Sequence, residues 1–424
     1  MHRFSKTALA AALVAALGGA ILTAPASAGK KEQPVSDGSF VLSKEVRASA
    51  LAARTALAAN DYASAETAVS AVEAQARNDD ERYVALTLRV ALLSTIPPTS
   101  RSMKALVDPL DALIANSRTQ PADRARYNYT RGDIAYASKQ YAKAVQFYQR
   151  ARDGGMQDDE LNYQIVRANM EGGDIVAGAD ALDTLIKAQV AAGKKPPENW
   201  YRYVLKRLFN AQKNAEVSTW TVKWLAAFPS PQNWRDAIYN LGFRADTEKR
   251  LTNQDRIDLY RLMAATHSLA GQSDYLDYAN AALALKLSGE ARSVLDAARA
   301  GGVLSATDKS VIALAAKAKA GAAADKTFAV REKAAAAAAA GDPAALVGDG
   351  YIGAHNYPKA IAMYDLALTR NVASADAVHL HRGIAYAMSG DKEKARADFA
   401  AVTAAPQTEI AALWAAWLDA PAAA

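Results

Sequence analysis

Histidine is scarce in this sequence, and its spacing does not suit a metal site. Four of the five histidines follow residue 28, namely His267, His355, His379 and His381. His379 and His381 are two residues apart, so on a helix their side chains point about 200° apart. A helix that binds zinc through two histidines spaces them three or four residues apart. We therefore expect ordinary surface or groove histidines, with no metal bound.

Two acidic runs, at residues 79–81 and 158–160, contain the neighbouring carboxylates that acid–base catalysis could use. Each run is expected to begin a helix, where carboxylates cap unpaired N–H groups and complement the helix dipole. The sequence has no G-x-S-x-G motif, no glycine-rich phosphate loop and no cysteine. The absence of cysteine excludes thiolate nucleophiles, Cys-type zinc sites and iron–sulfur clusters. We therefore predict that the protein is not an enzyme and uses no cofactor.

Four of the six tryptophans lie within 35 residues, at positions 200, 220, 224 and 234. Trp220 and Trp224 are one helical turn apart, which favours packing in the core between helices. Trp200 and Trp234 follow prolines at expected helix starts, so they are the candidates for exposed aromatic anchors of a partner.

These residues must be positioned by helices, because a helix-forming pattern recurs along the chain. Four stretches share an alanine, a larger residue four positions later and an apolar residue three positions after that, which is one face of a helix. The alanines are Ala65, Ala144, Ala360 and Ala395, followed by Val69, Tyr148, Tyr364 and Phe399. Twelve residues before each alanine lies a small residue inside another helical pattern: Ala53, Gly132, Gly348 or Gly383. The repeated unit is therefore helix, short turn, helix, with small residues where the two helices cross.

The last two copies are 35 residues apart, a period typical of stacked helical hairpins. Gly383, Tyr386, Ala395 and Phe399 match the spacing of the G, Y, A and F of the tetratricopeptide pattern, with Pro406 near its closing proline. The sequence thus resembles the tetratricopeptide repeat family, most closely over residues 342–403 and 125–152. The resemblance implies an all-α fold, a right-handed superhelical solenoid of stacked helix-turn-helix hairpins.

In that family the first helix of each hairpin lines a concave groove that binds extended peptides or partner helices. Carried onto this sequence, the resemblance implies groove positions at Asp133, Tyr136, Asp349, Ile352 and Ile384. The Asn and Lys residues with which some members clamp a peptide carboxylate are absent at these positions. A groove with acidic and aromatic side chains suits a neutral or basic, partly apolar segment.

The N-terminus has the features of a secretory signal peptide. Arg3 and Lys6 precede an apolar stretch at residues 7–22, and Ala26, Ser27 and Ala28 form an A-x-A cleavage site. We expect cleavage after Ala28 and a periplasmic mature protein without an integral membrane segment. Removing Arg3 and Lys6 lowers the formal net charge from +6 to +4, and no dense basic block remains, which argues against nucleic acid as a partner.

The predicted organisation follows from the repeats and from the proline-rich breaks between them. Residues 1–28 are the signal peptide and 29–41 a disordered leader. Residues 42–230 hold N-terminal repeats, 231–340 degenerate repeats, and 341–424 C-terminal repeats with a capping helix at 407–418.

Two functions are consistent with the sequence. The first is a non-catalytic periplasmic scaffold that binds envelope proteins or extended peptides along its concave groove. The alternative is a helical repeat protein that binds peptidoglycan or an oligosaccharide through the aromatic residues of 200–234, which requires exposed tryptophan rings. The sequence leaves the identity of the partner and the oligomeric state open.

Overall fold

The computed structural model describes residues 40–96, 100–243, 251–324 and 327–420. These residues form an all-α helical repeat fold, in which the only pairing of strand type is an isolated bridge between Ala340 and Asn371. The chain divides into two compact units, Met1–Pro196 and Pro197–Ala424. The division falls between Pro196 and Pro197, one of the proline-rich breaks between repeats. The predicted signal peptide and residues 29–39 of the predicted leader lie outside the described residues.

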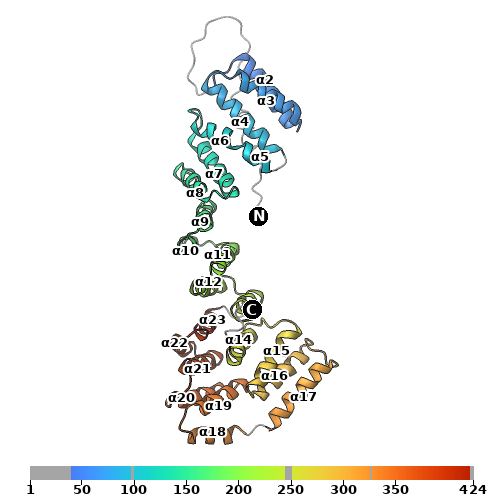
Figure 1. The fold of residues 1–424 in the computed structure, drawn as a ribbon, viewed down its shortest axis with the longest axis vertical. Coiled ribbons are helices and arrows are strands. Elements are labelled where there is room, and N and C mark those ends of the chain that lie inside the picture. The colour runs from blue at the N-terminus through green and yellow to red at the C-terminus, as the bar shows by residue number, and fades with distance from the viewer. Residues whose placement is uncertain (1–39, 97–99, 244–250, 325–326, 421–424) are drawn as a thin grey trace. The chain divides into compact units, whose positions relative to one another are not determined.

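Unit 1 is a series of helices in which neighbours along the chain pack against each other (Figure 1). The pairs α2–α3, α7–α8 and α9–α10 are hairpins joined by short turns. Phe40 and Val41, the last two residues of the predicted leader, lie against α4, where Phe40 stacks on Tyr83 and the Val41 N–H donates to Asp80. The helices are α2 (Lys44–Ala58), α3 (Tyr62–Gln75), α4 (Asp79–Thr95), α5 (Ser100–Ala105), α6 (Val107–Ala115), α7 (Pro121–Ala137), α8 (Tyr141–Asp153), α9 (Asp159–Glu171) and α10 (Ile175–Ala191).

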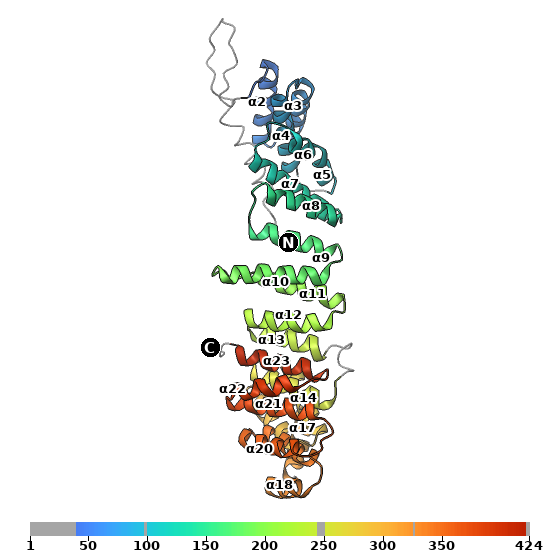
Figure 2. The same cartoon turned by 90° about the vertical axis from the view of Figure 1, so that its left-hand side faces the viewer.

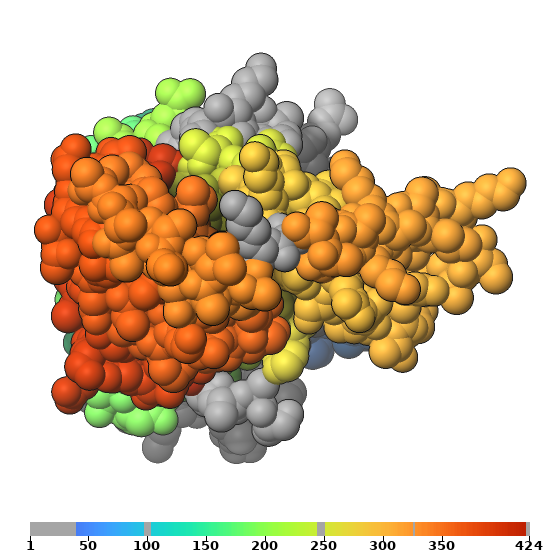
Figure 3. Space-filling model, turned by 90° about the horizontal axis from the view of Figure 1, so that it is seen from below, coloured from blue at the N-terminus to red at the C-terminus, as the bar shows by residue number. Residues whose placement is uncertain are grey.

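Unit 2 continues the hairpins but arranges them as two arms that lie side by side (Figure 1). The first arm is α14–α17 and the second is α18–α23, with α16 packed on α19 between them. The space-filling view shows α17 projecting beside the body formed by α18–α22 (Figure 3). The helices are α11 (Glu198–Asn210), α12 (Asn214–Ala227), α13 (Pro231–Ile238), the π-helix η1 (Tyr239–Phe243), α14 (Asn253–Ala265), α15 (Gly271–Ala284), α16 (Ser288–Ala300), α17 (Lys309–Ala324), α18 (Phe328–Ala337), α19 (Asp342–Gly353), α20 (Tyr357–Leu368), α21 (Ala375–Ser389), α22 (Lys392–Ala401) and α23 (Gln407–Asp419).

The predicted crossing of small and large residues is confirmed in both units. Ala65, Ala144, Ala360 and Ala395 are all fully buried. A Cβ atom added to Gly348 would lie 2.6 Å from the Tyr364 ring, and one added to Gly383 would lie 2.5 Å from the Phe399 ring. Glycine therefore allows the two helix axes to approach until the aromatic ring of the second helix fills the space beside the first.

Replacing Gly348 with alanine is expected to lower the free energy of unfolding of unit 2 by about 1–3 kcal/mol, as overpacking of a rigid core does. The Tyr364 ring is fully buried and has no room to move away from the new methyl group. All six tryptophans lie in unit 2, so tryptophan fluorescence during urea unfolding reports on this unit alone. Gly289→Ala is the matched control, because no atom lies within 4 Å of its added Cβ. Equal midpoints for the two variants would contradict the prediction.

The helix α23 lies where the capping helix at 407–418 was predicted, and it does more than cover the last hairpin. It packs on α21 and α22 and also on α12 and α14, more than 140 residues earlier in the chain (Figures 1 and 2). The Trp414 indole N–H donates to the Asp258 carbonyl at 3.3 Å, and Gln407 donates to the Asp255 carboxylate at 2.8 Å. Unit 2 is thus a stack of repeats that its own last helix closes.

Candidate functional site

A charged and aromatic surface on the first helices of two successive hairpins is the candidate binding site of unit 1. We call it the α7–α9 face and define it as Asp133, Tyr136, Glu160, Gln164 and Arg167, all of them half-buried. The Arg167 guanidinium donates to the Tyr136 hydroxyl at 3.0 Å and lies over the Tyr136 ring, 5.0 Å from its centroid. The structure therefore brings the predicted residues Asp133 and Tyr136 onto one surface with Arg167, a cation that was not among the predicted residues.

The α7–α9 face is ordered by a chain of hydrogen bonds. Arg167 also donates to the Gln164 side-chain oxygen at 3.1 Å, and the Gln164 amide donates to Glu160 at 2.6 Å. The Tyr148 hydroxyl on α8 donates to Asp133 at 2.8 Å. Tyr136 and Arg167 are 31 residues apart, close to one repeat, so the repeat period is the signal that could have paired them. These bonds hold the side chains in place before any partner arrives.

The carboxyl group of Asp133 has a raised pKa. Burial is the largest cause, and the charge of Glu160 adds to it, while the hydrogen bond from Tyr148 acts in the opposite direction. The net effect raises the pKa of Asp133 to about 6. At neutral pH the group is therefore a carboxylate that lacks much of its hydration, and a cation on a partner would stabilise it.

Asp133→Asn is expected to stabilise unit 1 by about 1–2 kcal/mol at pH 8 and by much less at pH 4. The folded carboxyl binds its proton more tightly than the unfolded one. The stability of the wild-type protein therefore falls as the pH rises from about 4 to about 6, and asparagine removes this loss. Asparagine also retains an oxygen that accepts from Tyr148. Hydrogen exchange of the amides in α7 and α8 measures the effect.

Asp180→Asn on α10 is the matched control for this prediction, because Asp180 is exposed on the same unit. It should change the opening free energy of α7 and α8 by less than about 0.5 kcal/mol at either pH. A stabilisation by Asp133→Asn that is the same at pH 4 and at pH 8 would refute the explanation based on desolvation.

In unit 2 the structure corrects three predicted groove residues. Asp349, Ile352 and Ile384 are buried, with exposed fractions of 5%, 4% and 0%. The physical reason is that the two arms of unit 2 pack together, so that α14 and α16 cover the faces of α19 and α21 that an open solenoid would expose. These three side chains do not line an open groove.

Asp349 instead belongs to a buried charge cluster, which we define as Asp258, Arg261, Glu290, Asp349 and His381. His381 lies between two carboxylates, with its Nε2 atom 2.9 Å from Asp258 and its Nδ1 atom 2.8 Å from Asp349. Burial lowers the pKa of His381, but the two carboxylates outweigh burial and raise the pKa to about 10. For Asp349, burial acts to raise the pKa. The charge of His381 outweighs burial, so the pKa of Asp349 lies below its ordinary value. His381 is therefore an imidazolium that donates from both nitrogens.

Arg261 is the second cation of the buried charge cluster. Its guanidinium donates to both oxygens of Glu290, at 2.9 and 2.8 Å, and to Asp258 at 3.0 Å. Tyr278 donates to Glu290 at 2.8 Å and Tyr364 donates to Asp349 at 2.6 Å. The cluster joins α14 and α16 of the first arm to α19 and α21 of the second, so it fixes how the two arms pack.

The sequence-based expectation of ordinary surface or groove histidines is wrong for His381, whose side chain is 5% exposed. No local signal marks it, because its partner Asp258 is 123 residues away. His379 faces a different direction, as the two-residue spacing predicted, and its Nδ1 atom lies 2.9 Å from Asp398. His267 and His355 are exposed.

The predicted aromatic anchors Trp200 and Trp234 are also corrected. Their exposed fractions are 2% and 4%, and Trp220 and Trp224 are 3% exposed. The Trp224 indole N–H donates to Glu198 at 3.0 Å, inside the packing of α11 against α12. Stacking on a sugar requires an exposed ring face, so the structure does not support an oligosaccharide site built from these four tryptophans.

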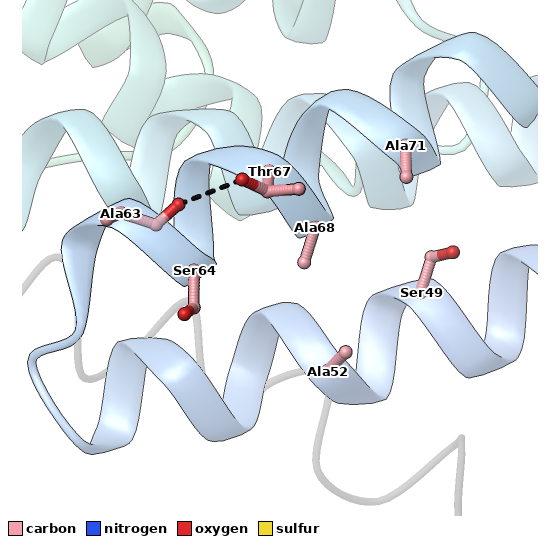
Figure 4. Close-up of a pocket in the computed structure, with 7 residues that line it drawn as sticks. All are labelled: Ser49, Ala52, Ala63, Ser64, Thr67, Ala68 and Ala71. Carbon is pink, nitrogen blue, oxygen red and sulfur yellow. Dashed lines mark hydrogen bonds between the residues drawn. The ribbon is translucent and has the colours of Figure 1, made fainter.

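A hollow of about 410 Å³ lies between α2 and α3 (Figure 4). The figure shows small side chains facing one another across it, with the Thr67 hydroxyl donating to the Ala63 carbonyl at 3.1 Å. The lining residues are Ser49, Ala52, Ala63, Ser64, Thr67, Ala68 and Ala71. This lining offers neither charge nor an aromatic ring, so it does not define the chemistry of a ligand.

Within the described residues, no group of three or more His, Asp or Glu side chains has an arrangement that could hold a metal ion. None of the helices in the described ranges is both long and apolar enough to cross a membrane.

The hairpins, their small–large crossings and the stacking of successive repeats define an all-α helical repeat protein. Its sequence matches no family model, and no curated protein matches it. Similar solved structures include the apo form of the quorum sensor NprR from B. thuringiensis. It has 14% identity over 77% of this chain and 98% of that chain, with a TM-score of 0.30. The pentatricopeptide repeat protein PPR10 from maize has 13% identity over 86% of this chain and 54% of that chain, with a TM-score of 0.31. The TPR domain of P58(IPK) has 14% identity over 88% of this chain and 97% of that chain, with a TM-score of 0.23.

Proposed function

We propose that this protein is a non-catalytic scaffold that binds a partner protein through the α7–α9 face of unit 1. The observation that carries the proposal is the contrast between the units. Asp133 and Tyr136 stay half-buried on a hydrogen-bonded surface, whereas the matching positions in unit 2 are covered by the protein itself. A surface that is charged, aromatic and already ordered binds a partner at little entropic cost.

The chemistry of the α7–α9 face defines the kind of segment it would accept. Asp133 and Glu160 supply negative charge, and Arg167 is already engaged by Tyr136 and Gln164. Desolvation of Asp133 makes pairing with a partner's Lys or Arg favourable. The Tyr136 ring supplies apolar area beside it. A neutral or basic segment with apolar side chains is therefore the best match.

The proposed location is the periplasm, and the proposed partner is a protein of the cell envelope. The support is the signal peptide pattern at residues 1–28. Intact-mass measurement of the protein recovered from a periplasmic extract tests this, with a mature chain that begins at Gly29 as the expected result. Recovery of the uncleaved chain from the cytoplasm would overturn the location.

In-cell photo-crosslinking tests the binding surface. A photoreactive amino acid at Tyr136 is expected to capture a defined envelope protein, and the same group at the exposed Thr184 on α10 serves as the control. Adding Asp133→Lys should reduce capture from position 136 by at least tenfold, because it removes the desolvated carboxylate and places a cation that repels a basic segment. Equal capture from both positions, or capture that is insensitive to Asp133→Lys, would refute the α7–α9 face as the binding site.

A further inference from the structure

Unit 2 contains a hollow of about 590 Å³ at the place where its last helix meets α12. Its walls come from the α11–α12 turn, from α12, from α13 and η1, and from α23. A volume of this size accommodates a short stretch of peptide or a small organic ligand. The lining residues are Phe209, Asn210, Gln212, Asn214, Val217, Ser218, Thr221, Ala237, Asn240, Leu241, Glu409 and Leu413.

The rim of this hollow is rich in carboxamides. Asn210, Gln212, Asn214 and Asn240 are exposed, and within the described ranges their side chains make no hydrogen bond to another residue. Each carboxamide can donate and accept at the same time, as a peptide unit does. The rim is therefore complementary to backbone amides, which present the same pair of groups.

The charged and aliphatic residues of the lining limit the class of ligand further. No Lys, Arg or His is among the lining residues, and Glu409 is the charged one. The lining side chains therefore offer an anionic ligand no cation to pair with. Three lining residues, Val217, Leu241 and Leu413, are aliphatic and less exposed than the carboxamides, so they suit contact with one apolar side chain.

The hollow depends on two features of the fold. The return of α23 to α12 supplies Glu409 and Leu413, and the π-helix η1 supplies Asn240 and Leu241. Gly242 allows η1 to approach α14 closely, because any larger residue would place its Cβ atom 2.2 Å from the Leu259 side chain. Single π-helical turns are frequent at functional sites, since the wider turn redirects side chains.

We propose that this hollow binds an uncharged, extended peptide segment that inserts one apolar side chain between α12, η1 and α23. The segment's backbone amides pair with the carboxamides of the rim. This inference rests on the proposed scaffold function and gives the scaffold a second binding site, separate from the α7–α9 face. An oligosaccharide is the less suitable occupant, because Phe209 is the one aromatic ring in the lining and it is half-buried.

The test uses the mature chain, residues 29–424, with ¹⁵N in the side-chain amides of Asn and Gln. N-acetyl-alanyl-leucyl-alanine amide is titrated to millimolar concentration and the side-chain NH₂ resonances are followed by NMR. We expect saturable shifts of the Asn210, Gln212, Asn214 and Asn240 signals. The acidic peptide N-acetyl-aspartyl-leucyl-aspartic acid amide should bind at least tenfold more weakly.

Two variants and a sugar test whether the carboxamides of the rim bind the peptide. Asn214→Ala combined with Asn240→Ala removes two exposed carboxamides without disturbing the core and should weaken peptide binding at least fivefold. Thr219→Ala, on the exposed side of α12, should leave it unchanged. The absence of shifts with the neutral peptide, equal binding of the acidic peptide, or preferential shifts with diacetylchitobiose would overturn the proposal. Crosslinking from position 136 is independent of these outcomes, so failure here is distinguishable from failure of the scaffold proposal.

Discussion

Arg261→Met is expected to lower the free energy of unfolding of unit 2 by about 3–5 kcal/mol, the usual cost of removing one partner from a buried ion pair. Methionine keeps the length of the side chain but leaves Glu290 buried without a cation and Asp258 with His381 as its one remaining cation. Both carboxylates are nearly inaccessible to water, with side-chain exposures of 5% and 1%. Urea unfolding followed by tryptophan fluorescence measures the change, because every tryptophan lies in unit 2.

Arg292→Met is the matched control for this prediction. Arg292 also pairs with a carboxylate, Asp296 at 3.4 Å, but both side chains are more than half exposed. Exposed pairs contribute only about 0–1 kcal/mol, so this variant should unfold close to the wild-type midpoint. Adding Glu290→Gln to Arg261→Met should recover part of the loss, since it removes one of the uncompensated charges. Similar midpoints for Arg261→Met and Arg292→Met would show that the buried charge cluster does not hold the arms together.

The second large effect is a dependence of unit 2 stability on pH that arises from His381. The pKa of His381 is about 10 in the folded protein and near 6.5 when unfolded, so the folded state binds the proton more tightly. The stabilisation is complete below pH 6.5 and is lost as the pH rises toward 10. We expect a loss on the order of 2–4 kcal/mol across this range. His381→Gln should remove this slope and should already be less stable at pH 6.5.

The comparison of slopes between variants separates His381 from other groups that titrate at high pH. His267→Gln provides the control, because His267 is exposed, and its slope should match that of the wild-type protein. The measurement is the midpoint of urea unfolding at intervals from pH 6 to pH 10. A slope that His381→Gln leaves unchanged would mean that His381 is not protonated between its two carboxylates.

The helices and their hairpins follow from local sequence, and these parts were predictable. A glycine followed twelve residues later by alanine and sixteen residues later by an aromatic residue defines one crossing, as at Gly383, Ala395 and Phe399. The acidic runs at 79–81 and 158–160 do begin α4 and α9, with Asn78 and Asp158 as N-caps. Each of these features depends on residues within about one repeat of each other.

Exposure was not predictable in the same way, and Asp133 and Asp349 show why. Each follows the glycine of its hairpin, and each accepts a hydrogen bond from a tyrosine fifteen residues later, Tyr148 or Tyr364. Their local surroundings are therefore alike, yet Asp133 is half-buried and Asp349 is buried beside His381. The difference comes from α14 and α16 of the first arm, which precede Asp349 by more than one repeat. A repeat pattern carries no information about a contact at that separation.

The same limit applies to the tryptophans and to the hollow beside α12. Helix starts next to prolines suggested exposure for Trp200 and Trp234, but neighbouring helices cover both rings. The carboxamides at positions 210, 212, 214 and 240 are individually unremarkable in sequence. They line one hollow because the fold brings Asn240 of η1 to the same hollow as the three carboxamides of the α11–α12 turn.

The closure of unit 2 by α23 also has a consequence for the order in which the chain folds. In an open repeat array each hairpin gains its stability from its neighbours, so folding can spread from any point as the chain emerges. Here Trp414 contacts Asp258 across 156 residues, and the buried charge cluster spans more than 120. Contacts of such long range slow folding, because their loops must close before the contacts form. Unit 2 therefore cannot complete its core until α23 has been made, and loss of α23 would weaken α12 and α14 first.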